Sequence, residues 1–411
     1  MKDLRSRAAT SGWMWVRERL TRITTGGDYL PEVDGIRFLA ITCVLLQHMY
    51  ERVSRRAQAV YPEALDPSPG WLFQQGDFGV QLFFALSGFI LFRGLVRTAE
   101  RGLVVRRDYG RYLLRRLTRL EPPYLLVITG IFLFLSLTGY QSGYSRSAQA
   151  GEQTLAQSYF ASVGYAHTWI YGAFPKLNPP TWSLETEFQF YLLAPLIVWP
   201  LRRCLGNPLA RLGVLAVMIV VAGTWLLPFA WEVSRLRHGL AVYLPLFLVG
   251  FAAGEIQEWL GRSRSLQPGL GRLLDIAGFA ALYCLLRTGY SGGAVGYCGL
   301  ILALILGCTG GTWLKPAMSW GFVPVLGGMC YSIYLVHLPF LEMAAGLTRK
   351  LGLGLPYGAY VALQGVLLLG ATFGVATFFY LLVERPCMDR LWPQRLGTWA
   401  RTKWAGGAGR R

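Results

Sequence analysis

The chain has 411 residues, of which 53% are hydrophobic and 15% are charged, with a net charge of +18 and a mean hydropathy of +0.37. This composition is too apolar for a water-soluble protein of this size, and several apolar runs approach the roughly 20 residues that a membrane-crossing helix needs. Because the runs lack strand-like alternation, we predict an all-α fold, a polytopic transmembrane helix bundle, rather than a β-barrel.

The positive charge is concentrated beside the apolar runs. Residues 93–119 hold nine arginines against two acidic residues, and residues 385–411 hold seven basic residues against one. Such clusters are typical of cytoplasmic membrane faces, where they also attract anionic lipid headgroups. No nucleic-acid-binding motif accompanies them, so we predict the lipid bilayer, and not nucleic acid, as a partner.

Residues 1–33 form a basic segment before the first apolar run. The stretch WMWVRERLTRI, residues 13–23, carries apolar side chains at helical spacing with arginines between them. This pattern predicts a helix lying on the cytoplasmic membrane surface, with a soluble helix as the alternative. The segment lacks the continuous apolar core of a cleavable signal peptide.

About ten spans are expected. They lie near residues 36–53, 77–97, 121–140, 180–201, 210–230, 239–257, 272–288, 293–311, 320–345 and 357–383. An even count and a basic N-terminus place both termini in the cytoplasm and predict a multi-pass protein of the inner or plasma membrane. Residues 34–386 then form the transmembrane domain, and 387–411 form a basic cytoplasmic tail.

Two features fit this topology less well. Arg349 and Lys350 fall on the outer side, against the usual charge distribution. Residues 141–179 hold a short apolar and aromatic stretch, which is either an interfacial or re-entrant helix or an eleventh span.

The first span carries Arg37 and His48 eleven residues apart. Eleven residues make about three helical turns, or roughly 16 Å, so both side chains share one face at different depths. Arg37 could hold an anion near the cytoplasmic surface while His48 does proton chemistry deeper in the membrane. Alternatively, Arg37 reaches the headgroups and His48 only hydrogen-bonds to another helix. Asp34 is expected to be the N-cap of this helix.

Two further motifs lie in the second span and at the start of the third. Ser87 and Gly88 in GVQLFFALSGFILF are small and favour close helix packing. The stretch lacks the G-x-S-x-G motif of a nucleophile elbow, so packing is the preferred interpretation. Arg116 and Arg119 in RRLTRLEPPY lie on adjacent helical turns, as phosphate binding requires. Ordinary positive-inside arginines explain this pair almost as well.

The fourth and ninth spans contain buried ionisable residues. Trp182 is expected at the outer interface and Glu187 about one and a half turns further in, where a carboxylate needs a partner such as a histidine. Glu185 lies nearer the surface and is expected to be solvated. His337, in YSIYLVHLP, is expected to be a packed histidine with satisfied hydrogen bonds. Nothing in the spacing of these residues indicates a metal site, and we predict none.

Taken in order, these segments resemble the acyltransferase-3 family of integral membrane O-acyltransferases. DGIRFLAITCVLLQH resembles the family's arginine–ten residues–histidine helix, and GVQLFFALSGF resembles its second-helix motif. The later family motifs are similar to RLTR before EPPY, WSLETEFQFY, YSIYLVHLP and FYLLVERP. All of these matches follow the family order, from residue 34 to residue 386. Two positions depart from the pattern, because Gln81 replaces a usual aspartate and Val336 replaces a common aromatic residue. We expect no C-terminal hydrolase-like domain of the kind that some members carry.

The resemblance implies transfer of an acyl group from cytoplasmic acyl-CoA to a hydroxyl, often of a cell-envelope glycan. Acyl-CoA, with acetyl-CoA as the commonest donor, would be a co-substrate, and no bound cofactor is implied. The positions that match the family motifs then receive roles. His48 would be the catalytic base, and Glu187 would support it or the acceptor, while Arg37, Arg116 and Arg119 would bind the donor. Trp182, Ser87, His337 and Tyr331 would line the acceptor side or the pocket.

Alternatives of other classes remain at this point. A proton-coupled secondary transporter also uses buried histidine, glutamate and arginine, but the chain shows neither internal repeats nor paired broken helices. A scaffold or receptor without chemistry would leave the ordered motifs unexplained. Direct transfer is favoured over an acyl-enzyme, since no serine or cysteine has an adjacent base in sequence. An envelope polysaccharide is the first expected acceptor and a macrolide-like metabolite the second, and the sequence gives no oligomeric state.

Overall fold

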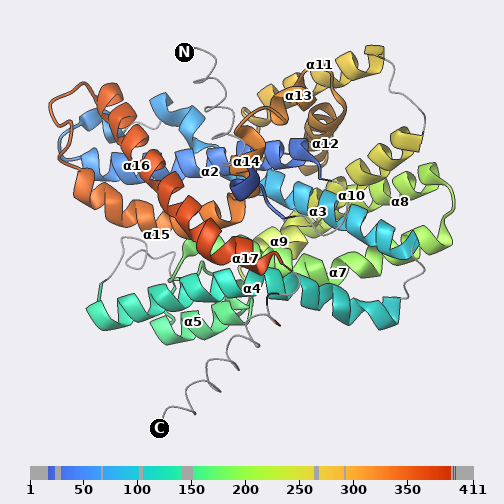
Figure 1. Cartoon of the computed structure of the whole chain (residues 1–411), viewed down its shortest axis with the longest axis horizontal. Helices are drawn as coiled ribbons and strands as arrows, with labels where there is room; N and C mark the ends of the chain where they lie inside the picture. The colour runs from blue at the N-terminus through green and yellow to red at the C-terminus, as the bar shows by residue number, and fades with distance from the viewer. Residues whose placement is uncertain are drawn as a thin grey trace, which may run out of the picture.

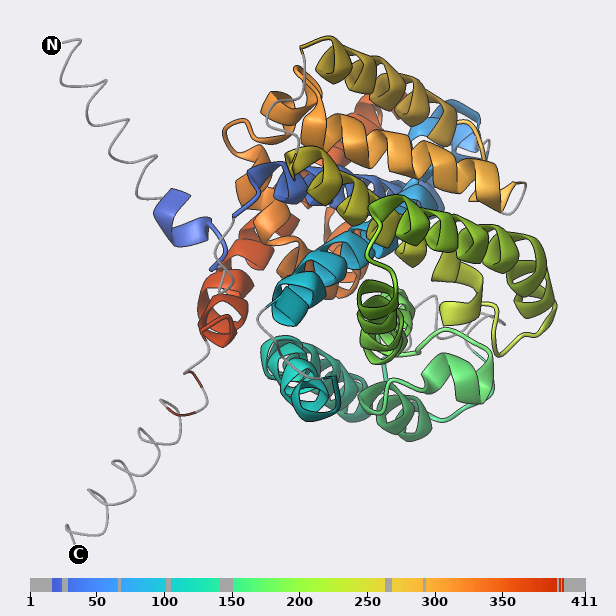
Figure 2. The same ribbon diagram turned by 90° about the vertical axis from the view of Figure 1, so that its right-hand side faces the viewer.

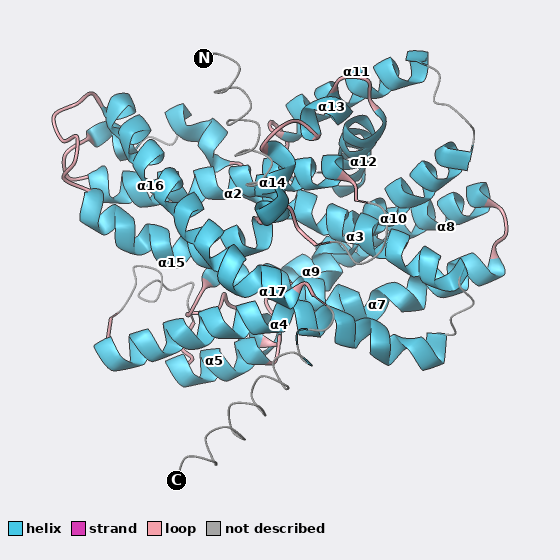
Figure 3. Ribbon diagram, in the orientation of Figure 1, coloured by secondary structure: helices cyan, strands magenta, loops and turns pink. Residues whose placement is uncertain are grey.

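The structure, a computed structural model, describes residues 17–23, 29–65, 68–100, 105–140, 151–262, 268–290, 293–389, 392 and 394. In this part of the chain the regular secondary structure is helical, without a β-strand (Figure 3). The all-α prediction is therefore confirmed. Of the predicted surface helix at 13–23, residues 17–20 are helical and residues 13–16 lie outside the described residues.

Long helices make up most of the described part of the chain (Figure 1), and ten of the helices there have 14 residues or more. They are α2 (Pro31–Ala57), α3 (Gly76–Glu100), α4 (Val105–Thr138), α7 (Trp182–Cys204), α8 (Pro208–Val221), α10 (Leu240–Arg262), α11 (Pro268–Leu285), α12 (Ala294–Gly310), α15 (Cys330–Thr348) and α16 (Tyr357–Phe379). Shorter elements connect or extend them: η1 (Pro62–Leu65), η2 (Ser68–Gln74), α5 (Leu155–Val163), α6 (His167–Tyr171), η4 (Pro179–Thr181), η5 (Ala222–Leu226), α9 (Leu227–Glu232), α13 (Leu314–Met318), α14 (Val323–Gly328), η7 (Tyr380–Glu384) and α17 (Arg385–Cys387).

The chain is a multi-pass membrane protein. Six helical segments of the described chain are long and apolar enough to cross a membrane: Gly70–Thr98, Asp108–Thr138, Pro208–Glu232, Leu240–Gly261, Cys330–Thr348 and Tyr357–Cys387. Each of the ten predicted intervals contains helix. The count of ten crossings and the cytoplasmic position of both ends stay predictions.

Two predicted stretches differ from continuous spans. The interval 320–345 is broken at Met329 between α14 and α15. There, α14 packs so closely on α2 that any side chain at Gly327 would overlap the backbone of Asp34. In the uncertain stretch 141–179, α5 has 9 residues and α6 has 5, which is too short to cross a bilayer. Residues 141–150 lie outside the described residues.

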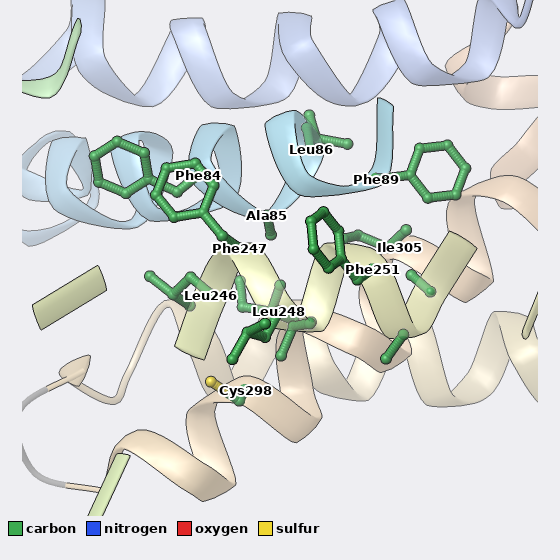
Figure 4. Close-up of a cluster of buried hydrophobic side chains, with 14 of the residues drawn as sticks. Phe84, Ala85, Leu86, Phe89, Leu246, Phe247, Leu248, Phe251, Cys298 and Ile305 are labelled. Atoms are coloured by element: carbon green, nitrogen blue, oxygen red, sulfur yellow. The ribbon is translucent and has the colours of Figure 1, made fainter. Parts of the chain in front are cut away.

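Helices α3 and α10 form the centre of the bundle. In their most apolar stretches 61% and 72% of residues are buried, against 17% in α4, which lies at the periphery (Figure 2). Figure 4 shows Phe84 and Phe89 of α3 beside Phe247 and Phe251 of α10. The two backbones approach closely because Gly88 faces the carbonyl oxygen of Phe247, where a Cβ would lie only 2.1 Å away.

This contact predicts a large difference between two glycines of α3. Gly88→Ala should separate α3 from α10 and lower stability by about 1–3 kcal/mol, because the overlap is with backbone. Gly94→Ala on the same helix meets nothing within 4 Å and should be neutral or stabilising by about 0.5–1 kcal/mol. Thermal unfolding of both variants in the same detergent measures the difference, and equal melting temperatures would contradict it.

Candidate active site

One cavity gathers most of the polar residues that the sequence singled out. It has an empty volume of ≈ 990 Å³, including its open end, and is bordered by α2, α3, α4, α7, α15 and η7. Its lining includes Arg37, Ser87, Arg116, Arg119, Glu187 and Tyr331. We call it the arginine cavity after Arg37, Arg116 and Arg119. The structure therefore brings three predicted donor-binding arginines to one site.

Asp34 orients the first of these arginines. Its Oδ1 accepts a hydrogen bond from Arg37 at 2.9 Å, and its Oδ2 accepts one from Nε of Arg22 at 3.1 Å. The expected N-cap role is wrong, because α2 begins at Pro31 and places Asp34 within its first turn. Asp34 is fully buried, so the carboxylate needs both guanidinium partners.

Arg116 and Arg119 approach the cavity from α4. The Arg116 guanidinium lies over the rings of Tyr112 and Tyr191, 5.9 and 5.5 Å from their centroids. Nε of Arg119 is buried and has no hydrogen-bond partner. Neither arginine forms an ion pair within the described residues. Both are thus able to bind an anion that enters the cavity.

Glu187 lies on the wall of the arginine cavity and is not bonded to a histidine. Its Oε1 accepts hydrogen bonds from the hydroxyls of Ser87 at 2.5 Å and Tyr191 at 2.6 Å. Ser87 therefore has a polar partner beyond the packing role expected for it. Tyr331, also in the lining, donates to the backbone oxygen of Leu120 at 2.7 Å, which ties α15 to α4.

Sequence reasoning missed several polar residues of this site. Glu384 lines the cavity from the π-helical turn η7 and accepts from the backbone N–H and the hydroxyl of Ser332. A carboxylate at the end of the last apolar run was a signal that could have found it. Tyr334 and Ser183 also line the cavity and hydrogen-bond to each other at 2.7 Å. Their pairing joins α15 to α7 across more than 150 residues, which sequence spacing does not indicate.

His48 pairs with His337, 289 residues away in the chain. Nδ1 of His48 lies 2.9 Å from Nε2 of His337, and the rings are stacked with centroids 5.1 Å apart. Nδ1 of His337 in turn lies 2.7 Å from the backbone oxygen of Tyr334. His337 is fully buried and satisfied, as expected, but its partner is the candidate base.

These contacts fix the tautomers of both rings. A carbonyl oxygen only accepts, so Nδ1 of His337 carries the proton, and in the neutral ring Nε2 is an acceptor. The facing Nδ1 of His48 must then donate, which leaves Nε2 of His48 unprotonated. Within the described residues no hydrogen bond uses this Nε2. The arrangement gives His48 the form that a general base requires.

The histidine pair lies beside the arginine cavity and not on its wall. Tyr334 lines the cavity, and its ring centroid is 5.7 Å from that of His337. The Tyr334 hydroxyl also donates to the backbone oxygen of Pro180. Tyr334 therefore contacts both the cavity and His337.

Four other predicted positions lie outside the arginine cavity. Trp182 packs in an aromatic cluster with Phe84, Phe174, His238 and Tyr243. Glu185 is fully buried and accepts from the backbone N–H and hydroxyl of Thr168, so its expected solvation is wrong. Gln81 accepts from the Tyr297 hydroxyl at 2.5 Å, and Val336 packs among apolar side chains.

Most of the chain matches one protein family. The sequence model of a family described as an acyltransferase domain matches residues 30–383, which is most of the chain. The chain belongs to the acyltransferase-3 family. The resemblance seen in the ordered motifs is thereby confirmed. No solved structure matches the chain.

Three relatives show what kinds of protein the chain is similar to. YrhL of Bacillus subtilis, which carries the name of a peptidoglycan O-acetyltransferase, is 23% identical over 87% of this chain and 55% of its own length. The peptidoglycan O-acetyltransferase OatA of Listeria monocytogenes is 22% identical over 90% and 57%, respectively. The O-acetyltransferase OatA of Staphylococcus aureus is 25% identical over 76% and 51%. The chain spans about half the length of the curated relatives it matches, and the transporter alternative finds no support among them.

The tautomer assignment predicts a specific nitrogen NMR pattern. The chain has four histidines, so ¹⁵N-histidine labelling gives few signals. His48 and His337 should both appear protonated at Nδ1 and unprotonated at Nε2. In His337→Leu, His48 loses the acceptor for its Nδ1 proton, and its signals should shift toward the other tautomer.

His167 provides an internal reference for this measurement. It lies in α6 outside the spans, and burial lowers its pKa to about 4, so it stays neutral at pH 7. Its Nδ1 faces the backbone oxygen of Ala173 at 3.1 Å, which holds the same tautomer in every variant. A His48 signal that is unaffected by His337→Leu would contradict the assignment.

Proposed function

We propose that this chain transfers an acetyl group from cytoplasmic acetyl-CoA to a hydroxyl of a cell-wall glycan, with His48 as the general base. The observation that carries the proposal is a base-competent histidine pair next to an arginine-lined cavity. The peptidoglycan O-acetyltransferase names of relatives support the reaction class and the acceptor. We further propose that the protein resides in the inner or plasma membrane with both ends in the cytoplasm.

The arginine cavity suits the phosphate groups of the donor. Arg116 and Arg119 have no carboxylate partner within the described residues, and Arg37 is oriented by Asp34. Guanidinium groups bind phosphate through paired N–H donors. Arg37 precedes His48 by about three turns, roughly 16 Å along α2, so the long pantetheine arm would bring the thioester toward the imidazoles. Tyr334 lines the cavity and contacts His337, so the arm would pass its side chain on this route.

His48 supplies the proton transfers. Nε2 of His48 takes the proton of the acceptor hydroxyl as the hydroxyl oxygen attacks the thioester carbonyl carbon. The C–S bond breaks, the acetyl group remains on the acceptor oxygen as an ester, and CoA leaves as the thiolate. The proton then passes from His48 to that sulfur, which restores neutral His48. Nε2 of His337 accepts the hydrogen bond from Nδ1–H of His48 throughout.

Glu187 receives a role that follows its contacts. Its carboxylate holds the hydroxyls of Ser87 and Tyr191 on the wall that faces the arginines. We therefore propose that Glu187 supports the donor side of the site. Ser87, Tyr331 and Tyr334 line the same cavity, whereas Trp182 packs in an aromatic cluster with the lining residue Phe84.

The first test is acetyl transfer by the purified protein. Protein in lipid nanodiscs is incubated with radiolabelled acetyl-CoA and soluble peptidoglycan strands, and label that mild base releases from the glycan measures the ester. His48→Ala should lower the rate by about 10²–10⁴-fold while acetyl-CoA affinity and folding stay normal. Near-normal turnover in a folded His48→Ala variant would remove His48 from the mechanism. Absence of both ester and thioester loss in the wild type would overturn the proposal.

The second test concerns donor binding. Arg116→Gln and Arg119→Gln should each remove a charge-assisted contact of about 1.5–3 kcal/mol, which corresponds to a roughly tenfold to hundredfold weaker affinity for acetyl-CoA. Lysine at either position should restore only part of it, because an ammonium lacks the bidentate fork. Saturating acetyl-CoA should recover much of the lost rate.

Arg111→Gln is the matched control for this test. Arg111 lies on the same helix, is 62% exposed and pairs with Asp108 away from the cavity, so its loss should leave donor affinity unchanged. The positive-inside alternative predicts lower membrane insertion for all three variants with normal affinity in the inserted protein. Unchanged affinity in inserted Arg116→Gln and Arg119→Gln would contradict the donor-site assignment.

A further inference from the structure

A second cavity lies next to the histidine pair. Its empty volume is ≈ 780 Å³, including its open end, and it is bordered by α4, the segment 176–179 before α7, α15 and Arg52 of α2. It shares no lining residue with the arginine cavity. Six of its lining residues carry a charge, an amide or an aromatic ring: Arg52, Phe134, Tyr140, Lys176, Asn178 and Glu342.

The chain places this second cavity one helical turn beyond the two imidazoles. Arg52 follows His48 by four residues on α2, and the lining residue Leu338 directly follows His337 on α15. Asn178 is attached to the same part of α15, since its Nδ2 donates to the backbone oxygen of Leu335 at 3.0 Å. The arginine cavity lies in the opposite direction along both helices, at Arg37 and Cys330. The histidine pair therefore lies between two separate cavities.

The lining combines unsatisfied polar atoms with aromatic rings. Asn178 is fully buried, and its Oδ1 has no hydrogen-bond partner. Lys176 forms no ion pair within the described residues. The rings of Phe134 and Tyr140 lie side by side with centroids 6.3 Å apart. A buried amide oxygen without a partner is costly against lipid chains, whereas a hydroxyl in the cavity would satisfy it.

The charges of the second cavity differ from those of the arginine cavity. Arg52 is neutralised by Glu342, with 2.7 Å between Nε and Oε2, and Glu342 also pairs with Arg56 at 3.1 Å. The lining thus lacks the group of unpaired arginines that a polyphosphate would need. A sugar hydroxyl can donate to the side-chain oxygens of Asn178 and Glu342, and its oxygen can accept from the Lys176 ammonium. The apolar face of a sugar ring can pack on Phe134 and Tyr140.

We infer that the second cavity binds the acceptor glycan and presents one of its hydroxyls to His48 from the side opposite the donor. This inference rests on the proposed function, which makes the glycan the acceptor. Binding of a glycan in this cavity is a separate property that can be measured without the reaction. A sugar in this cavity is held by Asn178 and Lys176, one turn from the base. Donor and acceptor then enter from different cavities and meet at the histidine pair.

The test measures binding of soluble peptidoglycan strands to the protein in nanodiscs without acetyl-CoA. Gly130 borders the cavity, and a Cβ there would meet nothing within 4 Å, so Gly130→Phe places a ring at the cavity without a backbone clash. Glycan affinity should fall roughly tenfold to hundredfold. Gly110→Phe is the matched control, because Gly110 lies on the same helix in equally open space away from the second cavity.

Polar variants test the contacts separately. Lys176→Gln and Asn178→Ala should each weaken glycan binding by roughly tenfold, with acetyl-CoA affinity unchanged. Lys350→Gln changes the same residue type at an exposed position outside the cavity and should bind as the wild type does.

The outcomes separate this inference from the proposed function. Suppose that the wild type transfers acetyl groups and that Gly130→Phe, Lys176→Gln and Asn178→Ala bind the glycan with unaltered affinity. This result would overturn the second cavity as the acceptor site and leave the proposed function standing. Glycan binding that these variants weaken, without any acetyl transfer, would support the cavity and overturn the reaction. No glycan binding by the wild type, as expected if lipid chains fill the cavity, would overturn the inference directly.

Discussion

Helix α2 carries ionisable side chains through an apolar bundle, and each must find a partner there. An unpaired charge or imidazole in a low-dielectric interior is costly, so polar pairs set the position of the helix. Asp34 binds Arg22 and Arg37, His48 meets His337, and Arg52 meets Glu342. The last two pairs lie about one turn apart on both α2 and α15, which fixes the relative register of these helices. The same pairs bring the two cavities to opposite ends of one polar stripe.

The order of these pairs also bears on topology. From the His48–His337 pair to the Arg52–Glu342 pair, the residue numbers rise on both helices. The helices α2 and α15 therefore run in the same direction. In a membrane protein, two parallel spans are separated by an odd number of crossings. The predicted count makes α15 the ninth span and α2 the first, which satisfies this requirement. The parallel direction fixes only the parity of the crossings between α2 and α15, and the count of ten stays a prediction.

The sequence predicted local features better than pairings between helices. Apolar runs indicated a helix in each predicted interval, and the i, i+3 spacing of Arg116 and Arg119 indicated a shared site. The His48–His337 bond joins residues 289 positions apart, and one sequence contains no signal for such a contact. Glu187 shows the same limit, because its need for a partner was correct but Ser87 and Tyr191 supply it. Asp34 was misread because the helix starts at Pro31, four residues earlier than an N-cap at Asp34 implies.

The arrangement also bears on the choice between direct transfer and an acyl-enzyme. The sequence disfavoured an acyl-enzyme because no serine had an adjacent base, yet the structure places Ser87 2.5 Å from the Glu187 carboxylate. However, Ser87 lines the arginine cavity, whereas the histidine pair lies beside that cavity, where Tyr334 contacts His337. An acetyl group on Ser87 would stay in the arginine cavity, which shares no lining residue with the cavity proposed for the acceptor. A hydroxyl that enters by the second cavity needs only to reach His48, so the separation of the cavities favours one direct transfer at the imidazole.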